Sequence, residues 1–182
     1  MSADCLVVID MQERLLPVIG SADSITQRCR FLLEAAGLLS VPIILTEQYP
    51  RGLGATVEVL RNAAANTAVL EKLQFSAADV IQKAGLLHPE CRQLVLAGIE
   101  THICVQQTAL DLIAAGWKVT LAADASGSRH ELDRSIAISR LQVAGVVVSS
   151  AEAIAFEWCR TAEHPAFRQL SALVRAQPIR SA

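Results

Sequence analysis

Residues 94–113 read LVLAGIETHICVQQTALDLI, and this stretch joins two hydrophobic patterns. Residues 94–97 are continuously apolar, as in a strand that is buried on both faces. The apolar residues that follow recur at the spacing of one helical face: Val105, Ala109, Leu112 and Ile113. The stretch therefore predicts a strand, a junction at residues 98–104 (GIETHIC) and a helix.

The junction presents a cysteine, Cys104. Thr101 is a candidate N-cap, which would place Cys104 in the first helical turn. Unpaired backbone N–H groups and the positive end of the helix dipole favour a thiolate there, so we expect the pKa of this thiol to lie below its usual value of about 8.5. The plainer interpretation is a small buried hydrophobic side chain. Partners elsewhere in the chain decide between the two.

The rest of the chain alternates short apolar runs with helical patterns. Strand-like runs occupy residues 5–9, 42–46, 68–71, 93–98, 117–122 and 146–148. Helical spacing covers residues 25–39, 56–64, 77–84, 102–115, 129–143, 151–158 and 165–176, and residues 47–54 (EQYPRGLG) predict a loop. The runs are rich in Val, Ile and Leu, which favours a parallel sheet covered on both faces. We expect a single domain over residues 1–182, with an α/β, three-layer α/β/α Rossmann-like fold and a six-stranded parallel sheet of order 3-2-1-4-5-6.

One predicted helix has a marked start and a marked face. Ser128 and Glu131 have the spacing of a capping box, so the helix is expected to begin near Arg129. The residues that continue on one face are Leu132, Ile136, Ser139 and Val143.

Composition limits the possible partners. A net charge of -2 with no basic cluster argues against nucleic acid and anionic membranes, and leaves a small-molecule substrate as the expected ligand. The apolar runs stop far below the roughly 20 residues that span a bilayer, so no membrane segment is expected. The 52% of hydrophobic residues predicts a homo-oligomer, either a dimer or a tetramer. The sequence shows no signal peptide, and its five scattered cysteines suit free thiols in a reducing cytoplasm.

Polar residues follow most of the strand-like runs. Asp10, Glu47, Lys72, residues 98–104 and Asp124 all come at or just after such a run. Ligands in an open α/β sheet gather at the carboxyl ends of the strands. We therefore expect these residues to share one crevice.

Four segments resemble one enzyme family. VVIDMQ (residues 7–12), EKLQFSA (71–77) and GIETHICVQQTALD (98–111) are similar to the three signature segments of the isochorismatase-like cysteine hydrolases, in the same order. DASGSRHELDRSIAISRLQVAGV (124–146) resembles the next segment of that family. The similarity covers about residues 5–157, and residues 47–54 most resemble the isochorismatase domain-containing subgroup.

The resemblance implies a catalytic triad of Asp10, Lys72 and Cys104. Taken singly, Asp10 reads as a strand-end carboxylate and Lys72 as a solvated lysine. Together they have a chemical logic, because a cysteine nucleophile needs a base, and a lysine can hold the two anions in place. The family also implies a cis peptide bond at residues 99–100 and an oxyanion hole from the backbone N–H groups of Glu100 and Cys104.

The chain departs from some relatives of that family. Metal-binding nicotinamidases carry an Asp-x-His motif and a further histidine, where this chain has Glu47, Gln48 and Tyr49. The four histidines lack ligand spacing, so we expect no metal and no other cofactor, and nicotinamide is a less favoured substrate. Isochorismatases proper lack the cysteine nucleophile. Cys104 therefore favours hydrolysis of a small amide or related acyl substrate through a thioester.

The remaining pocket candidates surround the triad: Gln12, Glu47, Gln48, Tyr49, Phe75 and Thr101. Phe75 could equally belong to the core, and the Glu100 carboxylate could bind a cationic or amide group or point to solvent. Residues 158–182 could close the site or an interface. An alternative function is a non-enzymatic interaction protein that keeps the fold as a scaffold. A dinucleotide-binding oxidoreductase is disfavoured, because no G-x-G-x-x-G follows the first strand.

Overall fold

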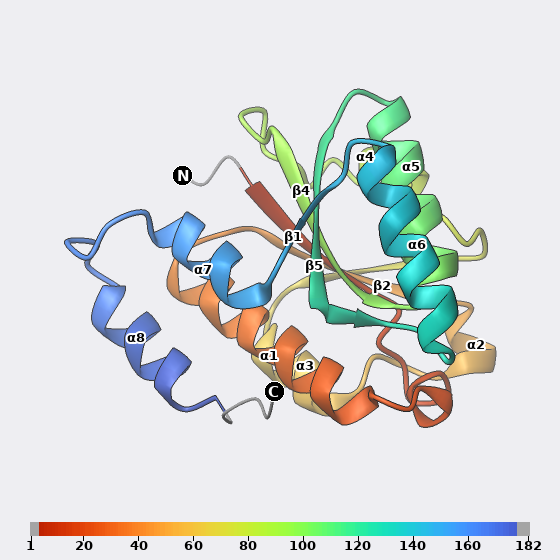
Figure 1. Ribbon diagram of the computed structural model, residues 1–182, viewed down its shortest axis with the longest axis horizontal. Coiled ribbons are helices and arrows are strands. Elements are labelled where there is room, and N and C mark those ends of the chain that lie inside the picture. The colour runs from red at the N-terminus through yellow and green to blue at the C-terminus, as the bar shows by residue number, and fades with distance from the viewer. Residues whose placement is uncertain (1–3, 178–182) are drawn as a thin grey trace.

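The computed structural model describes residues 4–177 and contains a six-stranded sheet (Figure 1). The strand order is β3-β2-β1-β4-β5-β6, and every neighbouring pair is parallel. The strands are β1 (Asp4–Ile9), β2 (Ile43–Gln48), β3 (Ala68–Lys72), β4 (Gln93–Ile99), β5 (Lys118–Gly127) and β6 (Val147–Ser149). The predicted fold class and strand order are confirmed.

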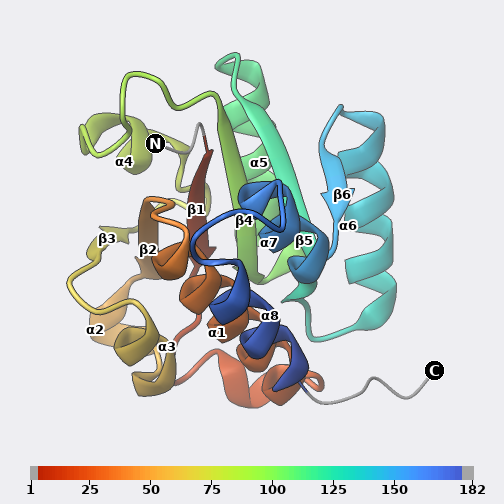
Figure 2. The same ribbon diagram turned by 90° about the vertical axis from the view of Figure 1, so that its left-hand side faces the viewer.

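Helices cover both faces of the sheet, as Figures 1 and 2 show. One face packs against α1 (Ala22–Leu38), α3 (Glu58–Ala63), α7 (Ala151–Cys159) and α8 (Phe167–Arg175). The other packs against α4 (Ala78–Lys83), α5 (Gln106–Ala114) and α6 (Glu131–Val143). Along β1, Leu6 and Val8 join the first layer, whereas Val7 and Ile9 join the second. Because successive side chains of a strand point to opposite faces, a strand buried on both faces is apolar throughout.

The region predicted as a loop is partly regular. β2 continues to Gln48, and residues 50–53 form a short helix, α2 (Pro50–Leu53). Proline suits the first turn of a helix because its fixed φ is already helical and its missing N–H has no partner there. Gly54 ends the helix with a φ of 80°, which few residues other than glycine adopt. Proline and glycine therefore bound a helix here, and the prediction of a loop was wrong for residues 47–48 and 50–53.

The predicted capping box of α6 was also wrong. The helix begins at Glu131 with His130 at the N-cap, and no side chain caps it. The Ser128 hydroxyl instead lies 2.9 Å from Nδ1 of His102. The helix turns Ala137 and Leu141 into the core, so the face singled out in the sequence is not the one that packs on the sheet.

The junction after β4 is helical from Thr101 onward. Residues 101–105 form a π-helical segment, η2 (Thr101–Val105), that runs directly into α5. Glu100 occupies its N-cap position, so Thr101 is not the cap that was predicted. A further short helical turn, η1 (Leu16–Val18), precedes α1. Within residues 4–177, no helix has both the length and the apolar character needed to cross a membrane.

Gly98 allows β4 to approach β1 at the carboxyl edge of the sheet. It lies opposite Ile9 in the parallel ladder with a φ of 112°, a conformation that L side chains rarely adopt. A Cβ atom at this position would collide with the backbone carbonyl oxygen of Ile9. Glycine is therefore required where the segment that carries Cys104 leaves the sheet.

We predict that Gly98→Ala lowers the free energy of unfolding by at least about 1–3 kcal/mol, because it forces a strained backbone. Urea unfolding followed by circular dichroism measures the change. The matched control is Gly37→Ala within α1, where a new Cβ would meet no atom within 4 Å. The free energy of unfolding of that variant should rise by roughly 0.5–1 kcal/mol, because alanine favours the helix more than glycine does. Equal stabilities of the two variants would contradict the role of Gly98.

Candidate active site

The three residues of the predicted triad meet at the carboxyl edge of the sheet. Asp10 follows β1, Lys72 ends β3, and Cys104 lies in η2 after β4. The Lys72 Nζ atom is 2.6 Å from Oδ2 of Asp10, and the two side chains are 1% and 0% exposed. Because β2 lies between β1 and β3, Lys72 crosses β2 to form this ion pair.

Hydrogen bonds hold both members of the ion pair. The Thr46 hydroxyl donates to Oδ1 of Asp10 at 2.7 Å. Besides Asp10, the Lys72 ammonium donates to Oε1 of Gln48 at 2.7 Å and to the carbonyl oxygen of Phe75 at 3.0 Å. An ammonium has three protons, so every one of them has an acceptor. The pair is therefore locked in position by main-chain and side-chain contacts from β2 and from the segment after β3.

Cys104 is a thiol in this site. Burial is the main cause that raises the pKa of Cys104 to about 12, and the negative charge of Asp10 adds to it. The positive charge of Lys72 acts in the opposite direction and lowers the pKa. The hydrogen bond of the thiol with Asp10 also raises the pKa of Cys104, and its hydrogen bond with Lys72 lowers it. The expectation that the helix start favours a thiolate was wrong, because desolvation and the neighbouring carboxylate dominate.

Glu100 lies at the entrance to η2. A cis peptide bond joins Ile99 and Glu100, as the family resemblance implied. The Glu100 carboxylate accepts hydrogen bonds from the backbone N of Arg129 at 3.0 Å and from its Nε at 3.2 Å. The Glu100 side chain is only 11% exposed, so it does not extend into solvent. It is instead paired with Arg129, which lies just before α6.

The polar side chains predicted for the substrate pocket form most of their hydrogen bonds with the main chain. Gln12 is fully buried, and its amide donates to the carbonyl oxygens of Gln48 and Gly54 and accepts from the Gln48 N–H. Glu47 accepts from both the N–H and the hydroxyl of Thr56. The Gln48 amide binds Lys72 and the Leu73 carbonyl oxygen. These three side chains therefore hold the main chain around the site in place.

The other candidates lie closer to solvent or have no polar partner. Tyr49 and Phe75 are 50% and 53% exposed, so Phe75 is not a core residue. Tyr49 lines a pocket of about 330 Å³ together with Lys72 and Leu73. Thr101 is buried, and its hydroxyl makes no hydrogen bond within residues 4–177.

Two buried threonines complete the site and were not predicted. Thr46 binds Asp10, as described, and faces Ile9 in the β1–β2 ladder. Thr108 donates to the carbonyl oxygen of Cys104 at 2.6 Å and accepts from the Ala77 N–H at 2.8 Å. Its position four residues after Cys104, on the same helical face, was the available signal.

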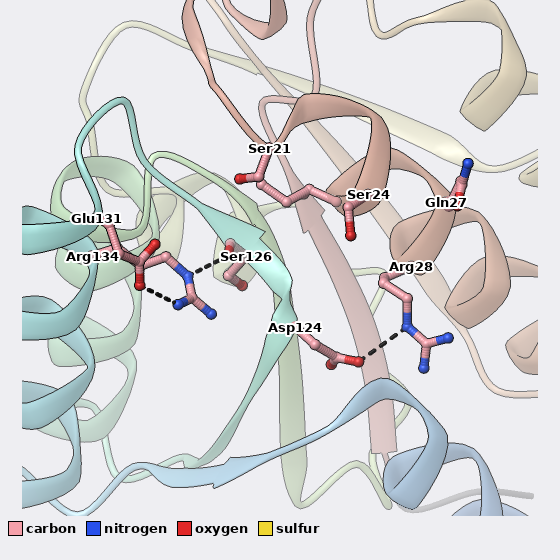
Figure 3. Close-up of a pocket in the computed structure, with 9 residues that line it drawn as sticks. Ser21, Ser24, Gln27, Arg28, Asp124, Ser126, Glu131 and Arg134 are labelled. Carbon is pink, nitrogen blue, oxygen red and sulfur yellow. Dashed lines mark hydrogen bonds and ion pairs between the residues drawn. The ribbon is translucent and has the colours of Figure 1, made fainter. Parts of the chain in front are cut away.

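Asp124 does not join this crevice. It accepts hydrogen bonds from Nε of Arg28 at 3.0 Å and from the Ala151 N–H at 2.7 Å. A polar pocket of about 270 Å³ opens there, between the start of α1 and α6 (Figure 3). In Figure 3, Arg28 reaches from α1 toward Asp124, and Arg134 reaches from α6 toward Ser126. Apart from Asp124, none of the residues predicted for the crevice lines this pocket.

The described part of the chain contains no cluster of three or more His, Cys, Asp or Glu side chains that could hold a metal ion. At the positions compared with the nicotinamidase metal motif, the Glu47 and Gln48 side chains already bind Thr56 and Lys72. Metal independence stays a prediction.

Solved structures share this architecture. A structure described as the MAR1 ribonuclease from Caenorhabditis elegans superposes with a TM-score of 0.86 at 32% identity, over 98% of this chain and 96% of that chain. The YcaC gene product from Escherichia coli, described as an octameric hydrolase of unknown specificity, gives a TM-score of 0.85 at 24% identity, over 93% of this chain and 87% of that chain. The second likeness shows the fold alone.

Sequence comparisons identify the family. Isochorismatase domain-containing protein 2 of Bos taurus is 39% identical over 170 residues, which cover 93% of this chain and 82% of that protein. Isochorismatase domain-containing protein 1 of Salmo salar is 40% identical over 171 residues, which cover 92% of this chain. The chain spans only 59% of the Salmo salar protein's length. The family model of the isochorismatase domain matches residues 4–153, and the chain therefore belongs to the isochorismatase domain family.

Proposed function

We propose that the protein is a cysteine hydrolase that cleaves a small amide or related acyl substrate through a thioester on Cys104. The observation that carries the proposal is the buried Asp10–Lys72 ion pair, whose charges both act on the Cys104 thiol. A carboxylate that raises the pKa of a neighbouring thiol is also placed to accept its proton. Membership of the isochorismatase domain family supports a hydrolase.

The proposed reaction starts from the neutral thiol. Asp10 takes the Sγ proton while Sγ attacks the substrate carbonyl carbon, and the carbonyl oxygen becomes an oxyanion. The N–H groups of Glu100 and Cys104 donate to that oxygen. The carbon–nitrogen bond then breaks, Asp10 returns the proton to the departing amine, and a thioester remains.

Hydrolysis of the thioester uses the same groups. Asp10 takes a proton from water, which attacks the thioester carbonyl, and the proton then passes to Sγ as the acid leaves. Lys72 stays charged in both half-reactions and holds the carboxylate in place through its 2.6 Å contact. No metal or other cofactor takes part in the proposed mechanism.

The environment of the site favours a small substrate. The pocket beside Lys72 has about 330 Å³, near the lower end of the range for small-molecule sites. Gln12, Glu47 and Gln48 do not line this pocket and instead hold the neighbouring chain segments in place. Tyr49 lines this pocket, and the exposed Phe75 ring and the unpaired Thr101 hydroxyl are further candidate substrate contacts. The substrate class stays at the level of a small amide or related acyl compound.

The cellular location, oligomeric state and partners of the enzyme are also proposals. We place it in the cytoplasm, because all five cysteines are free and buried. A homo-oligomer is proposed from the apolar composition, and the E. coli relative is an octamer. The C. elegans protein is called a ribonuclease, but an RNA substrate is not favoured here, because the chain carries a net charge of -2 and no basic cluster in its sequence.

The alternative is an interaction protein that keeps the fold without catalysis. The network of contacts around Asp10 and Lys72 could then serve stability alone. Turnover of any substrate that depends on Cys104 would exclude this alternative.

We predict that the protein hydrolyses at least one member of a panel of small primary and secondary amides. Release of ammonia or amine measures the hydrolysis. Cys104→Ala should abolish turnover, and Asp10→Asn should lower kcat by about 10²–10⁴-fold, because the general base is lost. Cys159→Ala, which removes a buried cysteine from α7, is the matched control and should keep activity. Circular dichroism verifies folding of each variant. Full turnover by Cys104→Ala would exclude the proposed mechanism.

The raised pKa of Cys104, about 12, predicts a distinctive pH dependence of alkylation. The thiolate reacts with iodoacetamide, and its fraction rises about tenfold per pH unit below the pKa. Modification of the Cys104 peptide, measured by mass spectrometry, should be slow at pH 7 and still accelerating at pH 9.5. Asp10→Asn should accelerate it at each pH, because the negative charge that raises the pKa is gone. A plateau in the wild type below about pH 8.5, the usual thiol value, would show that the resting site favours the thiolate.

A further inference from the structure

A second pocket, of about 430 Å³, opens at the β3 edge of the sheet. Residues of β2, β3 and α3 line it, and Figure 2 shows α3 near these two strands. Five of the side chains that line the pocket are charged: Glu13, Glu47, Glu58, Arg61 and Glu71. Four carboxylates and one guanidinium give the pocket a formal charge of -3, whereas the whole chain carries -2. The negative charge of the protein is therefore concentrated here.

The acidic pocket and the proposed active site lie on opposite faces of the sheet. Lys72 points toward Asp10 at the active site. Glu71 precedes Lys72 in β3, and successive side chains of a strand point to opposite faces. Val69, two residues before Glu71, accordingly packs in the same layer as Leu60 of α3. The inference drawn from this pocket therefore does not rest on the proposed function.

Glu47 is a buried carboxylate without a cationic partner. The residue is 7% exposed, and its Oε1 atom accepts hydrogen bonds from the N–H and the hydroxyl of Thr56 at 2.7 and 2.8 Å. Its other oxygen, Oε2, makes no hydrogen bond or ion pair within residues 4–177, and Glu47 lines the pocket. Buried charges in proteins are normally paired, because an isolated buried charge is costly. A cation bound in the pocket would supply the missing partner.

The parallel ladder places a second carboxylate beside the first. Glu47 of β2 lies opposite Glu71 of β3 in the register of the sheet. Like charges at neighbouring positions of adjacent strands repel each other. None of the four carboxylates of the pocket forms an ion pair within the described part of the chain, and Arg61 forms none there either. The repulsion is therefore not relieved by the protein itself.

The arrangement of the carboxylates suits an extended cation better than a metal ion. Among the described residues, no three His, Cys, Asp or Glu side chains are grouped closely enough to hold one metal ion. Ala55 and Val69 line the pocket between the carboxylates and supply apolar surface. Its volume lies within the range of small-molecule sites.

We propose that this pocket binds a linear aliphatic polyamine. One ammonium group pairs with Glu47 and Glu71, and a second pairs with the other two carboxylates. The methylene groups between them contact Ala55 and Val69.

Isothermal titration calorimetry with spermidine tests the site. The wild type should bind one molecule per chain, and added NaCl should weaken binding, because salt screens exposed charges. Glu71→Gln should weaken binding at least about tenfold, as expected for the loss of a charged hydrogen bond. Glu71 is exposed, so the variant should fold, which circular dichroism verifies. Glu157→Gln removes the same charge from an exposed position on α7, and this matched control should bind like the wild type.

Arg61 provides a test of opposite sign. Arg61→Gln should tighten spermidine binding, because it removes the positive charge that repels the ligand. Butylamine, which carries a single ammonium group, should bind more weakly than 1,4-diaminobutane, which carries two. Absence of spermidine binding at millimolar concentrations, or equal affinities of Glu71→Gln and Glu157→Gln, would overturn the proposed site. Equal affinities for butylamine and 1,4-diaminobutane would overturn a polyamine as the ligand class.

Discussion

The ion pair between Lys72 and Asp10 is the interaction on which the site depends. Taking two charges out of water is costly, and such a pair is tolerated only when the geometry is good and the remaining donors and acceptors are satisfied. Both side chains are at most 1% exposed, and Thr46, Gln48 and Phe75 complete their hydrogen bonds. Loss of one partner would leave the other charge buried and uncompensated, at a cost of about 3–5 kcal/mol. The pair thus joins the carboxyl ends of β1 and β3 and also creates the electrostatic field at Cys104.

That field explains why the position of Cys104 at a helix start is not sufficient to activate it. Desolvation and the Asp10 charge raise the pKa of the thiol, and Lys72 offsets only part of this effect. A resting thiol suits the proposed mechanism, because the proton leaves only when a substrate carbonyl is present to accept the sulfur. The same carboxylate would then account for both the raised pKa of the thiol and the proposed proton transfer.

Much of the fold, and the meeting of Asp10 and Lys72 at one edge of the sheet, could be predicted from the sequence, because both depend on local patterns. Buried strands read as apolar runs, and residues placed after them must meet at one edge of the sheet, as Asp10 and Lys72 do. The hydrogen bonds between side chains and main chain around the site could not be predicted in this way. Gln12 binds the Gly54 carbonyl oxygen, and that contact depends on how α2 returns the chain to the sheet.

Three sequence-based expectations were wrong because they depended on contacts outside the local pattern. β5 continues to Gly127 past a register shift against β4, so Asp124 lies within the strand and binds Arg28 instead of facing the crevice. Hydrophobic periodicity located an exposed face of α6, but periodicity identifies a face and does not say whether the core covers it. Thr101 failed as a cap because the π-helical turn places Glu100 at that position.

The central claim is that the acyl group of the substrate passes through a bond to the Cys104 sulfur. Rapid acid quench of the enzyme with an amide that it hydrolyses, followed by intact-mass analysis and peptide mapping, tests this most directly. The account predicts a transient mass increase equal to the acyl group, located on the Cys104 peptide, together with one equivalent of released amine. Release of that amine without any acyl-protein, or an acyl group on another residue, would contradict it.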